Sequence, residues 1–349
     1  MGLFNNRVTS PNGKTQVPVW FMRQAGRYHA HYQNIKKDSD FMTMCKDPKL
    51  ACEITMGPLD EFGFDAAILF SDLLFPLQQL GMDLVYAPGP KLGQTLDSKQ
   101  LIQELKVTTE SKQFYNFQKE ACQLLRPRLD QKETAITLLG FTGAPFTLYT
   151  YATEGSHAGG LISSKQGLYD GRFLDFCEKL IPLTIEQLSL QAEGGADAVC
   201  LFDTAAGEMA LNEYKKFAVP AIQKVVSGFK KLHPDKKVIY YAKMAHLEYY
   251  HALETRDIDV LGIDWRCNLG QALTELGPDY YVQGNFDPSL LHLPWQQLEE
   301  RLKEFWAPIS GHPNLSKWIM GLGHGVLQKT PEENVKKTIE YVHEHFTYA

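Results

Sequence analysis

The stretch Val17-Pro-Val-Trp-Phe-Met-Arg-Gln-Ala-Gly-Arg-Tyr28 joins a short apolar run to two arginines. The run over residues 17–21 predicts a strand, and Arg23 and Arg27 follow it directly. If the chain turns helical there, residues four apart share one face, and both guanidiniums converge on the same space. A guanidinium is permanently charged and binds carboxylates through two hydrogen bonds. The stretch therefore predicts a site for a polyanionic acid; the alternative is a pair of surface arginines held by local acids.

Apolar, β-branched runs like the first one recur along the chain at fairly even intervals. The further candidate strands are residues 66–70, 135–139, 198–202, 238–242, 258–263, 280–283 and 317–320. They are continuous apolar runs rather than alternating ones, which is typical of strands buried on both faces.

Helical patterns lie between these runs. The clearest helices are predicted over residues 49–61, 111–129, 172–193, 210–232, 295–305 and 331–346. For the last helix, Thr330 is the expected N-cap and Glu333 completes a capping box. Such alternation predicts parallel strands, and about eight strand-helix units close naturally into a (β/α)₈ TIM barrel of the α/β class. A doubly wound open sheet is the alternative, but no Gly-x-Gly-x-x-Gly follows the first strand.

Composition narrows the class of protein. The chain has 349 residues, which we expect to form a single catalytic barrel domain with a short irregular N-terminal segment. Its net charge is −6, from 35 basic and 41 acidic residues, so no basic surplus points to nucleic acid or an anionic membrane. No signal peptide or membrane span is evident. The six cysteines include no Cys-x-x-Cys pair and predict reduced thiols in a cytoplasmic protein.

Polar residues follow every predicted strand. In (β/α)₈ barrels the chemistry lies at the carboxyl-terminal ends of the strands, so these residues should meet on one rim. In chain order they are Arg23 and Arg27, Ser71 and Asp72, Tyr149 and Tyr151, Asp203 and Thr204, Lys243, Asp264 and Arg266, Asn285 and Asp287, and His324.

Four of these residues allow both a functional and a structural interpretation. Asp72 lies between apolar runs, where a carboxylate needs donors; it could also cap a helix, although Pro76 would interrupt that helix early. Tyr151 could serve only for packing. His324, with glycine on both sides, either is catalytic or holds its neighbours. Lys243 could form a Schiff base or a structural salt bridge.

Several segments carry distinctive motifs: residues 18–28, 65–74 (Asp-Ala-Ala-Ile-Leu-Phe-Ser-Asp-Leu-Leu), 143–151 with Glu154-Gly155, 284–288 (Gly-Asn-Phe-Asp-Pro), and 323–325 (Gly-His-Gly) before Thr330-Pro331. Together these segments resemble the uroporphyrinogen decarboxylase family. They span nearly the whole chain in the family's order, and Met-Arg-Gln-Ala-Gly-Arg-Tyr is highly specific.

The resemblance implies a single-domain barrel, usually a homodimer, acting on a small-molecule substrate. The implied reaction converts the four acetate side chains of uroporphyrinogen III to methyls, giving CO₂ and coproporphyrinogen III in haem biosynthesis. No metal or organic cofactor is implied, and neither nucleic acid nor a membrane is an expected partner.

The resemblance also implies the site residues. The implied catalytic residues are Arg23, Arg27, Asp72 and Tyr151. The implied substrate contacts are Arg23, Gln24, Ala25, Gly26, Arg27, Asp72, Tyr151, Phe202, Thr204 and His324. Three features depart from the family pattern: Thr204 replaces the common Ser, Gly57 replaces a frequent Gln, and residues 156–170 lack the expected basic pattern.

Each of these side chains has an expected role. Asp72 accepts hydrogen bonds from pyrrole N–H groups and favours a cationic ring. Arg23 and Arg27 bind acetates or propionates, and a water or a substrate carboxyl delivers the proton. Tyr151 orients Asp72 or an acetate, while His324 contacts a propionate or positions an arginine.

Three other functions remain open from the residues. A zinc-dependent methyltransferase that acts with corrinoid proteins shares the fold but uses a His-x-Cys element, and here no histidine has a cysteine two residues later. A non-enzymatic tetrapyrrole-binding protein could keep the arginines without needing Asp72. An aldolase would use Lys243.

Overall fold

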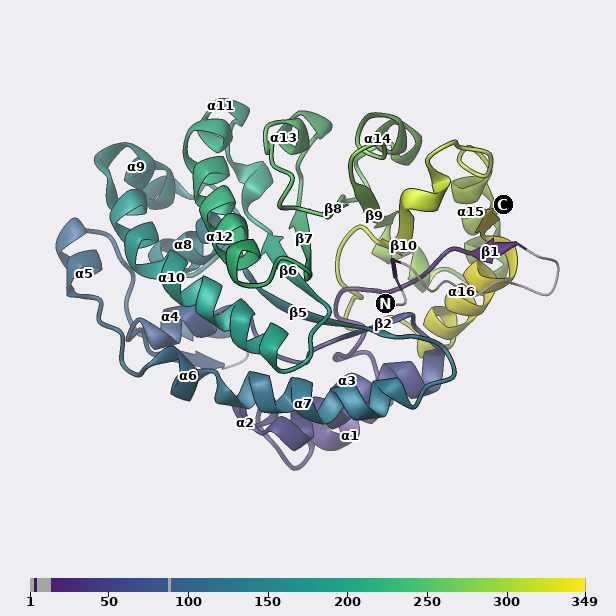
Figure 1. Ribbon diagram of the computed structural model, residues 1–349, viewed down its shortest axis with the longest axis horizontal. Coiled ribbons are helices and arrows are strands. Elements are labelled where there is room, and N and C mark those ends of the chain that lie inside the picture. Colours follow the sequence, from purple (N-terminus) through teal and green to yellow (C-terminus); the bar gives the residue numbers. More distant parts are fainter. Residues whose placement is uncertain (1–2, 5–13, 87–88, 349) are drawn as a thin grey trace.

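Seven parallel strands form one curled sheet at the centre of the molecule (Figure 1). The structure, a computed structural model, describes residues 3–4, 14–86 and 89–348. In spatial order the strands are β10 (Trp318–Leu322), β9 (Tyr281–Phe286), β8 (Val260–Gly262), β7 (Lys237–Ala242), β6 (Ala198–Asp203), β5 (Thr137–Gly143) and β2 (Ala66–Ile68). All seven runs match predicted strands, with bounds that differ by a few residues.

The first predicted strand, residues 17–21, is a strand only in part. Val19 forms an isolated parallel bridge with Met320, and its carbonyl accepts a hydrogen bond from the Asp65 amide at 3.0 Å. Pro18 has no N–H to donate, which shortens the ladder. The segment nevertheless lies between β10 and the start of β2, so it takes the eighth position of the ring. The predicted (β/α)₈ TIM barrel is confirmed, and the open sheet is not.

Six long helices alternate with the strands and surround them (Figure 1). They are α3 (Pro48–Phe62), α7 (Asn116–Asp130), α10 (Arg172–Glu193), α12 (Val219–Leu232), α15 (Trp295–Trp306) and α16 (Glu332–His345). The shorter helices are α1 (Ala30–Lys36), α2 (Phe41–Lys46), α4 (Phe75–Gln79), α5 (Lys99–Glu104), α6 (Ser111–Phe114), α8 (Pro145–Glu154), α9 (Ile162–Asp170), α11 (Leu211–Glu213), α13 (Leu247–His251) and α14 (Leu269–Glu275).

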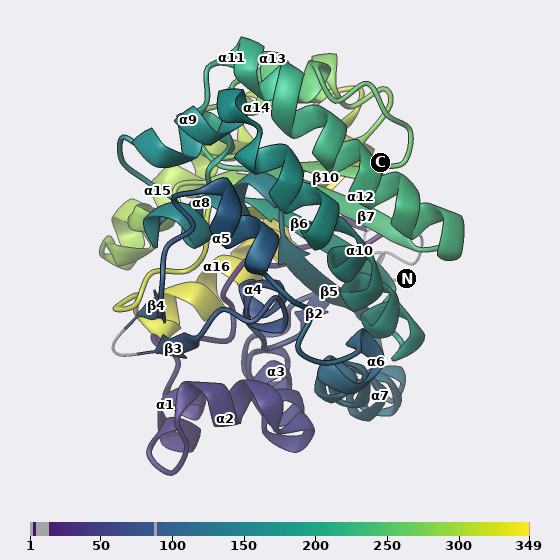
Figure 2. The ribbon, with the colours of Figure 1, turned by 90° about the vertical axis from the view of Figure 1, so that its left-hand side faces the viewer.

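Two small strand pairs lie outside the barrel sheet. β1 (Thr15–Gln16) pairs with β11 (Thr347–Tyr348), which joins the two ends of the described chain. β3 (Leu84–Tyr86) and β4 (Pro90–Leu92) form an antiparallel hairpin that packs against α2 and α4 (Figure 2). Neither pair was predicted, because each strand is too short for a periodic pattern.

Three helix predictions need correction. The helix over residues 210–232 is broken by a π-helical turn, Tyr214–Ala218, and the helix over 111–129 is interrupted at Tyr115. Thr330 is not the N-cap of α16; its hydroxyl lies 3.1 Å from His292 Nε2, and Glu333 forms an ion pair with Lys337 instead of a capping box. At Thr330, a tertiary partner outcompetes the local capping signal.

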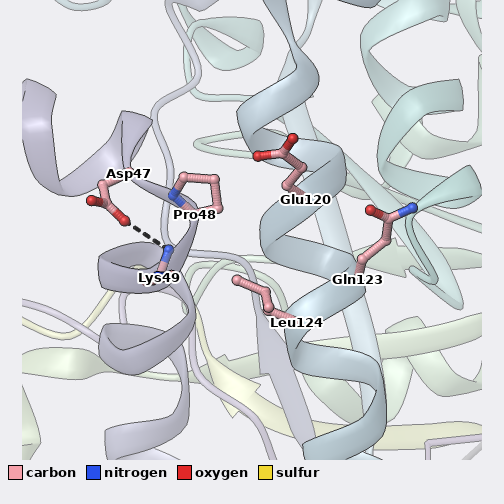
Figure 3. A pocket seen from close by; sticks show the side chains of 6 residues that line it. All are labelled: Asp47, Pro48, Lys49, Glu120, Gln123 and Leu124. Carbon is pink, nitrogen blue, oxygen red and sulfur yellow. Dashed lines mark hydrogen bonds between the residues drawn. The ribbon is translucent and has the colours of Figure 1, made fainter.

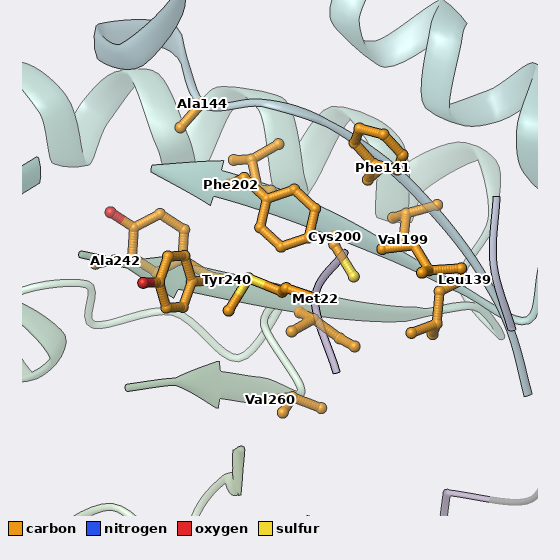
Figure 4. Close-up of a cluster of buried hydrophobic side chains, with 14 of the residues drawn as sticks. Met22, Leu139, Phe141, Ala144, Val199, Cys200, Phe202, Tyr240, Ala242 and Val260 are labelled. Atoms are coloured by element: carbon orange, nitrogen blue, oxygen red, sulfur yellow. The ribbon is translucent and has the colours of Figure 1, made fainter. Parts of the chain in front are cut away.

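Side chains fill the inside of the barrel. Figure 4 shows Met22, from the segment that closes the ring, among buried side chains that include the inward-facing Phe141 of β5 and Phe202 of β6. The barrel is therefore a packed core, and chemistry is possible only at its ends. No helix in the described part of the chain combines the length and apolarity needed to cross a membrane. The predicted irregular N-terminal segment falls largely on residues 1–2 and 5–13, outside the described residues.

Candidate active site

The loop after residues 17–21 is a series of turns, so the prediction that Arg23 and Arg27 share a helical face is wrong. Arg23 has φ 61°, in the left-handed region that few residues with a side chain adopt. Gln24 explains this path. Its buried side chain accepts from the Phe21 amide at 3.2 Å and donates to the Ala66 carbonyl at 2.8 Å, which fastens the loop to β2. Its polar atoms therefore have protein partners.

Both arginines instead reach the loop between β10 and α16. The Arg23 methylenes pass over Gly325, where an added Cβ would lie 2.5 Å from Arg23 Cδ. The Arg27 guanidinium donates to the side-chain oxygen of Gln328 at 2.7 and 2.9 Å, with the Gln328 amide oriented to accept. Two exposed cations thus lie along one side of the barrel mouth, held by a loop distant in sequence. Ala25 and Gly26, between them, are half-buried parts of the same turns.

Asp72 lies just beyond the end of β2 and is half-buried. Its Oδ1 accepts from the Leu74 amide at 2.8 Å, and no other hydrogen bond to it is found within the described chain. Burial raises the pKa of Asp72, while the Tyr86 hydroxyl, the Leu74 amide and the Arg23 charge oppose that rise. The N-cap position of α4 is Leu74, so the interpretation of Asp72 as a helix cap is wrong.

Tyr86 is a site residue that sequence reasoning missed. Burial and the neighbouring Asp72 carboxylate raise the pKa of Tyr86. Its hydroxyl is buried and has no partner with hydrogen-bond geometry among the described residues, although it lies close enough to act on Asp72. Tyr86 belongs to the β3–β4 hairpin, which follows none of the predicted strands, so no rule of strand ends could find it.

Tyr151 projects from α8, and the charge of Asp72 acts on its hydroxyl. Burial and the Asp72 charge raise the pKa of Tyr151 to about 12, and the Arg23 charge opposes that rise. Its hydroxyl lies 2.6 Å from Nδ1 of His157, in the loop after α8. His157 was not predicted, because it follows no strand and belongs to no recognised motif.

His324 follows β10 and stacks on Tyr241, with ring planes 2° apart and centroids separated by 6.2 Å. Burial, and then the charges of Arg23 and Lys243, lower the pKa of His324 to about 3, so its imidazole is neutral near pH 7. The flanking glycines do mark close backbone approach, as predicted. A Cβ at Gly323 would lie 2.4 Å from the backbone nitrogen of Trp265, so the approach is to protein.

The end of β6 contributes Phe202, Asp203 and Thr204. The Phe202 ring is only 8% exposed and packs against Tyr241. Asp203 is fully buried and accepts from the Thr147 hydroxyl at 2.7 Å and the Tyr240 hydroxyl at 2.9 Å. The Thr204 hydroxyl is buried and has no hydrogen-bond partner in the described part of the chain.

The strand ends of β7, β8 and β9 hold further polar residues. Asp264 is fully buried and pairs with Arg266, at 2.5 Å between Oδ2 and Nη1. Asn285 donates to two backbone carbonyls, and Asp287 caps a short 3₁₀ turn, so both have structural roles. Lys243 is half-buried and makes no side-chain hydrogen bond or ion pair with the described residues, so its predicted salt bridge is not observed.

Arg23 joins these elements into one site. Its charge acts on the pKa of Asp72, Tyr151 and His324, which come from three separate barrel segments. The site therefore offers the positive charge of Arg23 for binding the carboxylates of a ligand. It also offers Asp72, whose second oxygen accepts no hydrogen bond of full geometry from the described residues. An open surface hollow between α3 and α7 contains no predicted site residue (Figure 3); it is lined by Asp47, Pro48, Lys49, Glu120, Gln123 and Leu124.

The residues that could bind a metal ion are not the residues of the candidate active site. In the described ranges, the one cluster with ligand atoms close enough for a metal is His29, Glu61 and Glu332. It contains no cysteine and no predicted site residue. Each of the six cysteines is buried, and burial raises the pKa of Cys200 and Cys267. The His-Cys donor set of the zinc methyltransferase alternative is not assembled.

Comparisons with known proteins agree with this geometry. The family model described as "Uroporphyrinogen decarboxylase (URO-D)" matches residues 7–345. Uroporphyrinogen decarboxylase from Trichlorobacter lovleyi is 34% identical over 330 residues, 94% of each chain. The enzyme of that name from Chloroherpeton thalassium is 33% identical over 333 residues, 94% of this chain and 93% of the relative. A solved methyltransferase from Methanosarcina mazei is 15% identical, covers 95% of this chain and 94% of its own, and has a TM-score of 0.75, which shows the fold alone.

Proposed function

The chain belongs to the uroporphyrinogen decarboxylase family, and on that premise we propose that it decarboxylates uroporphyrinogen III. This carboxy-lyase converts the four acetate side chains to methyls and gives coproporphyrinogen III and CO₂, a step of haem and tetrapyrrole biosynthesis. One observation carries the proposal beyond family membership: Asp72, partly desolvated and holding one hydrogen bond, lies within the electrostatic reach of Arg23 at the mouth of the barrel.

The chemistry needs an acceptor for the electron pair of the breaking C–C bond. A pyrrole supplies it when its α-carbon is protonated, so the ring cation acts as the electron sink. Loss of CO₂ returns the pair to the ring system, a proton adds to the exocyclic carbon to form the methyl, and the ring loses its added proton. Each turn consumes one proton and one acetate. The protein must therefore bind carboxylates, stabilise a cation and supply a proton.

Asp72 is suited to stabilise the cation. The Tyr86 hydroxyl lies close to the carboxylate but makes no hydrogen bond of full geometry with it. The carboxylate therefore keeps lone pairs that can accept from pyrrole N–H groups. Burial raises its pKa, while those donors and Arg23 would lower the pKa and keep the carboxylate charged. A preorganised negative charge beside the ring favours the cationic intermediate over the neutral substrate.

The cationic side of the mouth is suited to bind the substrate's carboxylates. Arg23 and Arg27 would contact acetates or propionates, each charge-assisted bond contributing roughly 1.5–3 kcal/mol. Neither arginine is a good acid, so a water or a substrate carboxyl delivers the proton. Lys243, an unpaired amine close enough to act on His324, supplies further positive charge.

The remaining predicted residues shape the site. Tyr151 orients an acetate beside Asp72, the neutral His324 hydrogen-bonds a propionate, and Phe202 lies against the macrocycle. Thr204 offers its unpartnered hydroxyl. Gln24, Ala25 and Gly26 set the path of the loop that carries the two arginines. The Gln24 side chain does so through its hydrogen bonds to the backbone of Phe21 and Ala66.

The deciding experiment incubates the purified protein with chemically reduced uroporphyrin and counts the carboxylates of the products by chromatography. We expect stepwise loss of one carboxylate at a time, ending with four fewer than in the substrate. Binding without loss would favour the tetrapyrrole-binding alternative. A chelator should leave turnover unchanged; inhibition that zinc reverses would favour the methyltransferase.

The homodimer and the cytoplasmic location belong to the same proposal. Both are typical of the family that the chain resembles, and the six buried thiols suit a reducing compartment. Light scattering of the purified protein should give twice the mass of one chain. A monomer that remains fully active would remove the dimer from the proposal.

A further inference from the structure

Tyr151 and His157 form a close pair at the barrel mouth. The Tyr151 hydroxyl lies 2.6 Å from His157 Nδ1, and the two rings are 5.3 Å apart between centroids. Tyr151 is on α8, and His157 is six residues later in the loop to α9. Both side chains are half-buried. A contact this short between two groups that each can donate or accept raises the question of which one holds the proton.

The loop that carries His157 is fastened at both ends. Gly155, with φ 69°, ends α8 in the left-handed conformation that glycine adopts readily. The Glu154 carboxylate accepts from the Ser164 amide at 2.9 Å, and the Thr153 hydroxyl lies 2.6 Å from the Ser164 hydroxyl. The hydrogen bonds from α8 to α9 therefore fix the short span that contains His157, so its contact with Tyr151 is part of a defined loop structure.

Charged and titratable groups from five other segments face the pair, and one of them is Tyr86 of β3, which acts on Tyr151. Arg23 comes from the loop after residues 17–21, Lys243 from the end of β7 and His324 from the end of β10. Asp72, after β2, acts on the Tyr151 side of the pair. Burial, and then the charges of Lys243 and Arg23, lower the pKa of His157 to about 4.

These surroundings favour a neutral His157 in the free protein. In the tautomer that carries its proton on Nε2, which we take as the free state, the bare Nδ1 accepts from the Tyr151 hydroxyl. The single phenolic proton is then committed to the imidazole, and Tyr151 presents only lone pairs to the barrel mouth. Lone pairs repel a carboxylate, so this state of Tyr151 is unsuited to hold an anionic ligand.

We propose that His157 is a positioning residue whose protonation turns the Tyr151 hydroxyl toward a substrate carboxylate. When that carboxylate enters beside Arg23 and Lys243, it offsets the two charges that oppose a proton on His157. The imidazole takes one proton from solvent, its Nδ1–H donates to the Tyr151 oxygen, and the phenolic O–H donates to the carboxylate. A charge-assisted bond of this kind is about twice as strong as a neutral one.

The inference rests on the proposed function, since a carboxylate of that substrate is the trigger. It predicts that substrate binding takes up a proton at His157. It also predicts that His157 acts only through Tyr151, which a purely structural role for the loop would not require.

Three variants separate these roles. His157→Asn keeps a polar atom near the position of Nδ1, His157→Gln moves it toward that of Nε2, and His157→Phe keeps only a ring. We expect kcat/KM to fall roughly 10- to 100-fold in the Phe and Gln variants, the loss of one hydrogen bond to a charged group. The Asn variant should recover most of that loss at neutral pH. Thermal unfolding of each variant verifies that it folds.

Proton uptake on ligand binding separates the two roles, because it would not change if His157 served only the structure of the loop. Calorimetric titration with oxidised uroporphyrin, which keeps all four acetates, in two buffers of equal pH and different ionisation enthalpy, counts the protons taken up on binding. Wild type should take up more than the Asn variant, by up to about one proton. Adding His157→Phe to Tyr151→Phe should cause no further loss of kcat/KM.

Equal proton uptake in wild type and the Asn variant would overturn the inference. So would kcat/KM values within twofold of wild type for the Phe and Gln variants. Either result with an active wild type leaves the decarboxylase proposal intact. An inactive wild type would instead overturn the proposed function.

Discussion

Asp72 and Asp203 lie at the carboxyl ends of β2 and β6, two barrel strands separated by β5, but their surroundings differ. Asp203 is fully buried and accepts hydrogen bonds from two hydroxyls, those of Thr147 and Tyr240. Asp72 is half-buried and accepts one hydrogen bond, from the Leu74 amide. One acid is thus satisfied by the protein, and the other keeps an oxygen available.

The contrast separates the scaffold from the candidate site. A buried polar group that is fully hydrogen-bonded holds its neighbours in place. A partly desolvated group with spare hydrogen-bonding capacity carries a cost unless a ligand completes it. The same distinction applies to cations, since Arg266 is paired with the buried Asp264, whereas Lys243 has no ion pair among the described residues.

The sharpest test of this contrast changes Asp72. Asp72→Asn keeps the shape and the acceptor for the Leu74 amide but removes the negative charge. We expect kcat to fall roughly 10²–10³-fold, the loss that follows removal of one preorganised electrostatic contact. The unfolding free energy should change little. Steady-state kinetics with denaturant unfolding measure both, and near-normal kcat would exclude Asp72 from the mechanism.

Asp203 should show the opposite behaviour, with an effect on stability that depends on pH. Burial raises its pKa to about 6, above an unfolded value of 3.8. Between these values the folded state binds more protons than the unfolded state, so stability falls as pH rises. We expect wild type to lose up to roughly 3 kcal/mol relative to Asp203→Asn between pH 4 and 6.

Urea unfolding of both proteins across that range measures the difference. The Asp203→Asn protein should retain kcat within a few fold, because the wild-type Asp203 carboxylate is enclosed by protein hydroxyls and does not reach the substrate. Parallel stability curves for the two proteins would mean that Asp203 is not protonated in the folded state near pH 5.

The next test compares the two arginines. Arg27 binds Gln328 through its fork, whereas the methylenes of Arg23 pack over Gly325 and its charge lowers the pKa of Asp72. Arg27→Lys keeps the charge and loses the fork, so we expect kcat/KM to fall about tenfold. Gln328→Ala is the matched control. If Arg27→Lys kinetics match wild type, Arg27 serves only as a counter-charge.

Thr204→Ser should have the smallest effect. The hydroxyl remains, and only a methyl group is lost from a half-buried position. We expect kcat/KM within about twofold of wild type, the lower limit of what one methyl contributes. A large loss, measured in the same decarboxylation assay, would show that the methyl itself shapes the site.

Much of the architecture follows from local pattern. The bounds of α10, Arg172–Glu193, agree with the predicted helix, because one amphipathic stripe runs through all of its turns. The strand-end rule placed Asp72 and His324 at the barrel mouth, since buried parallel strands leave polar residues only beyond their carboxyl ends.

The sequence by itself therefore determined the barrel, the order of its strands and the rim where charged residues gather, because these depend on periodicity along the chain. Tertiary structure alone decided how those residues are used. The Gln24 side chain bonds Ala66, which sets the turn at Arg23, while the β3–β4 hairpin brings Tyr86 to Asp72 and the α8–α9 loop brings His157 to Tyr151. Such contacts join segments whose meeting no local period encodes, so only the folded chain reveals them.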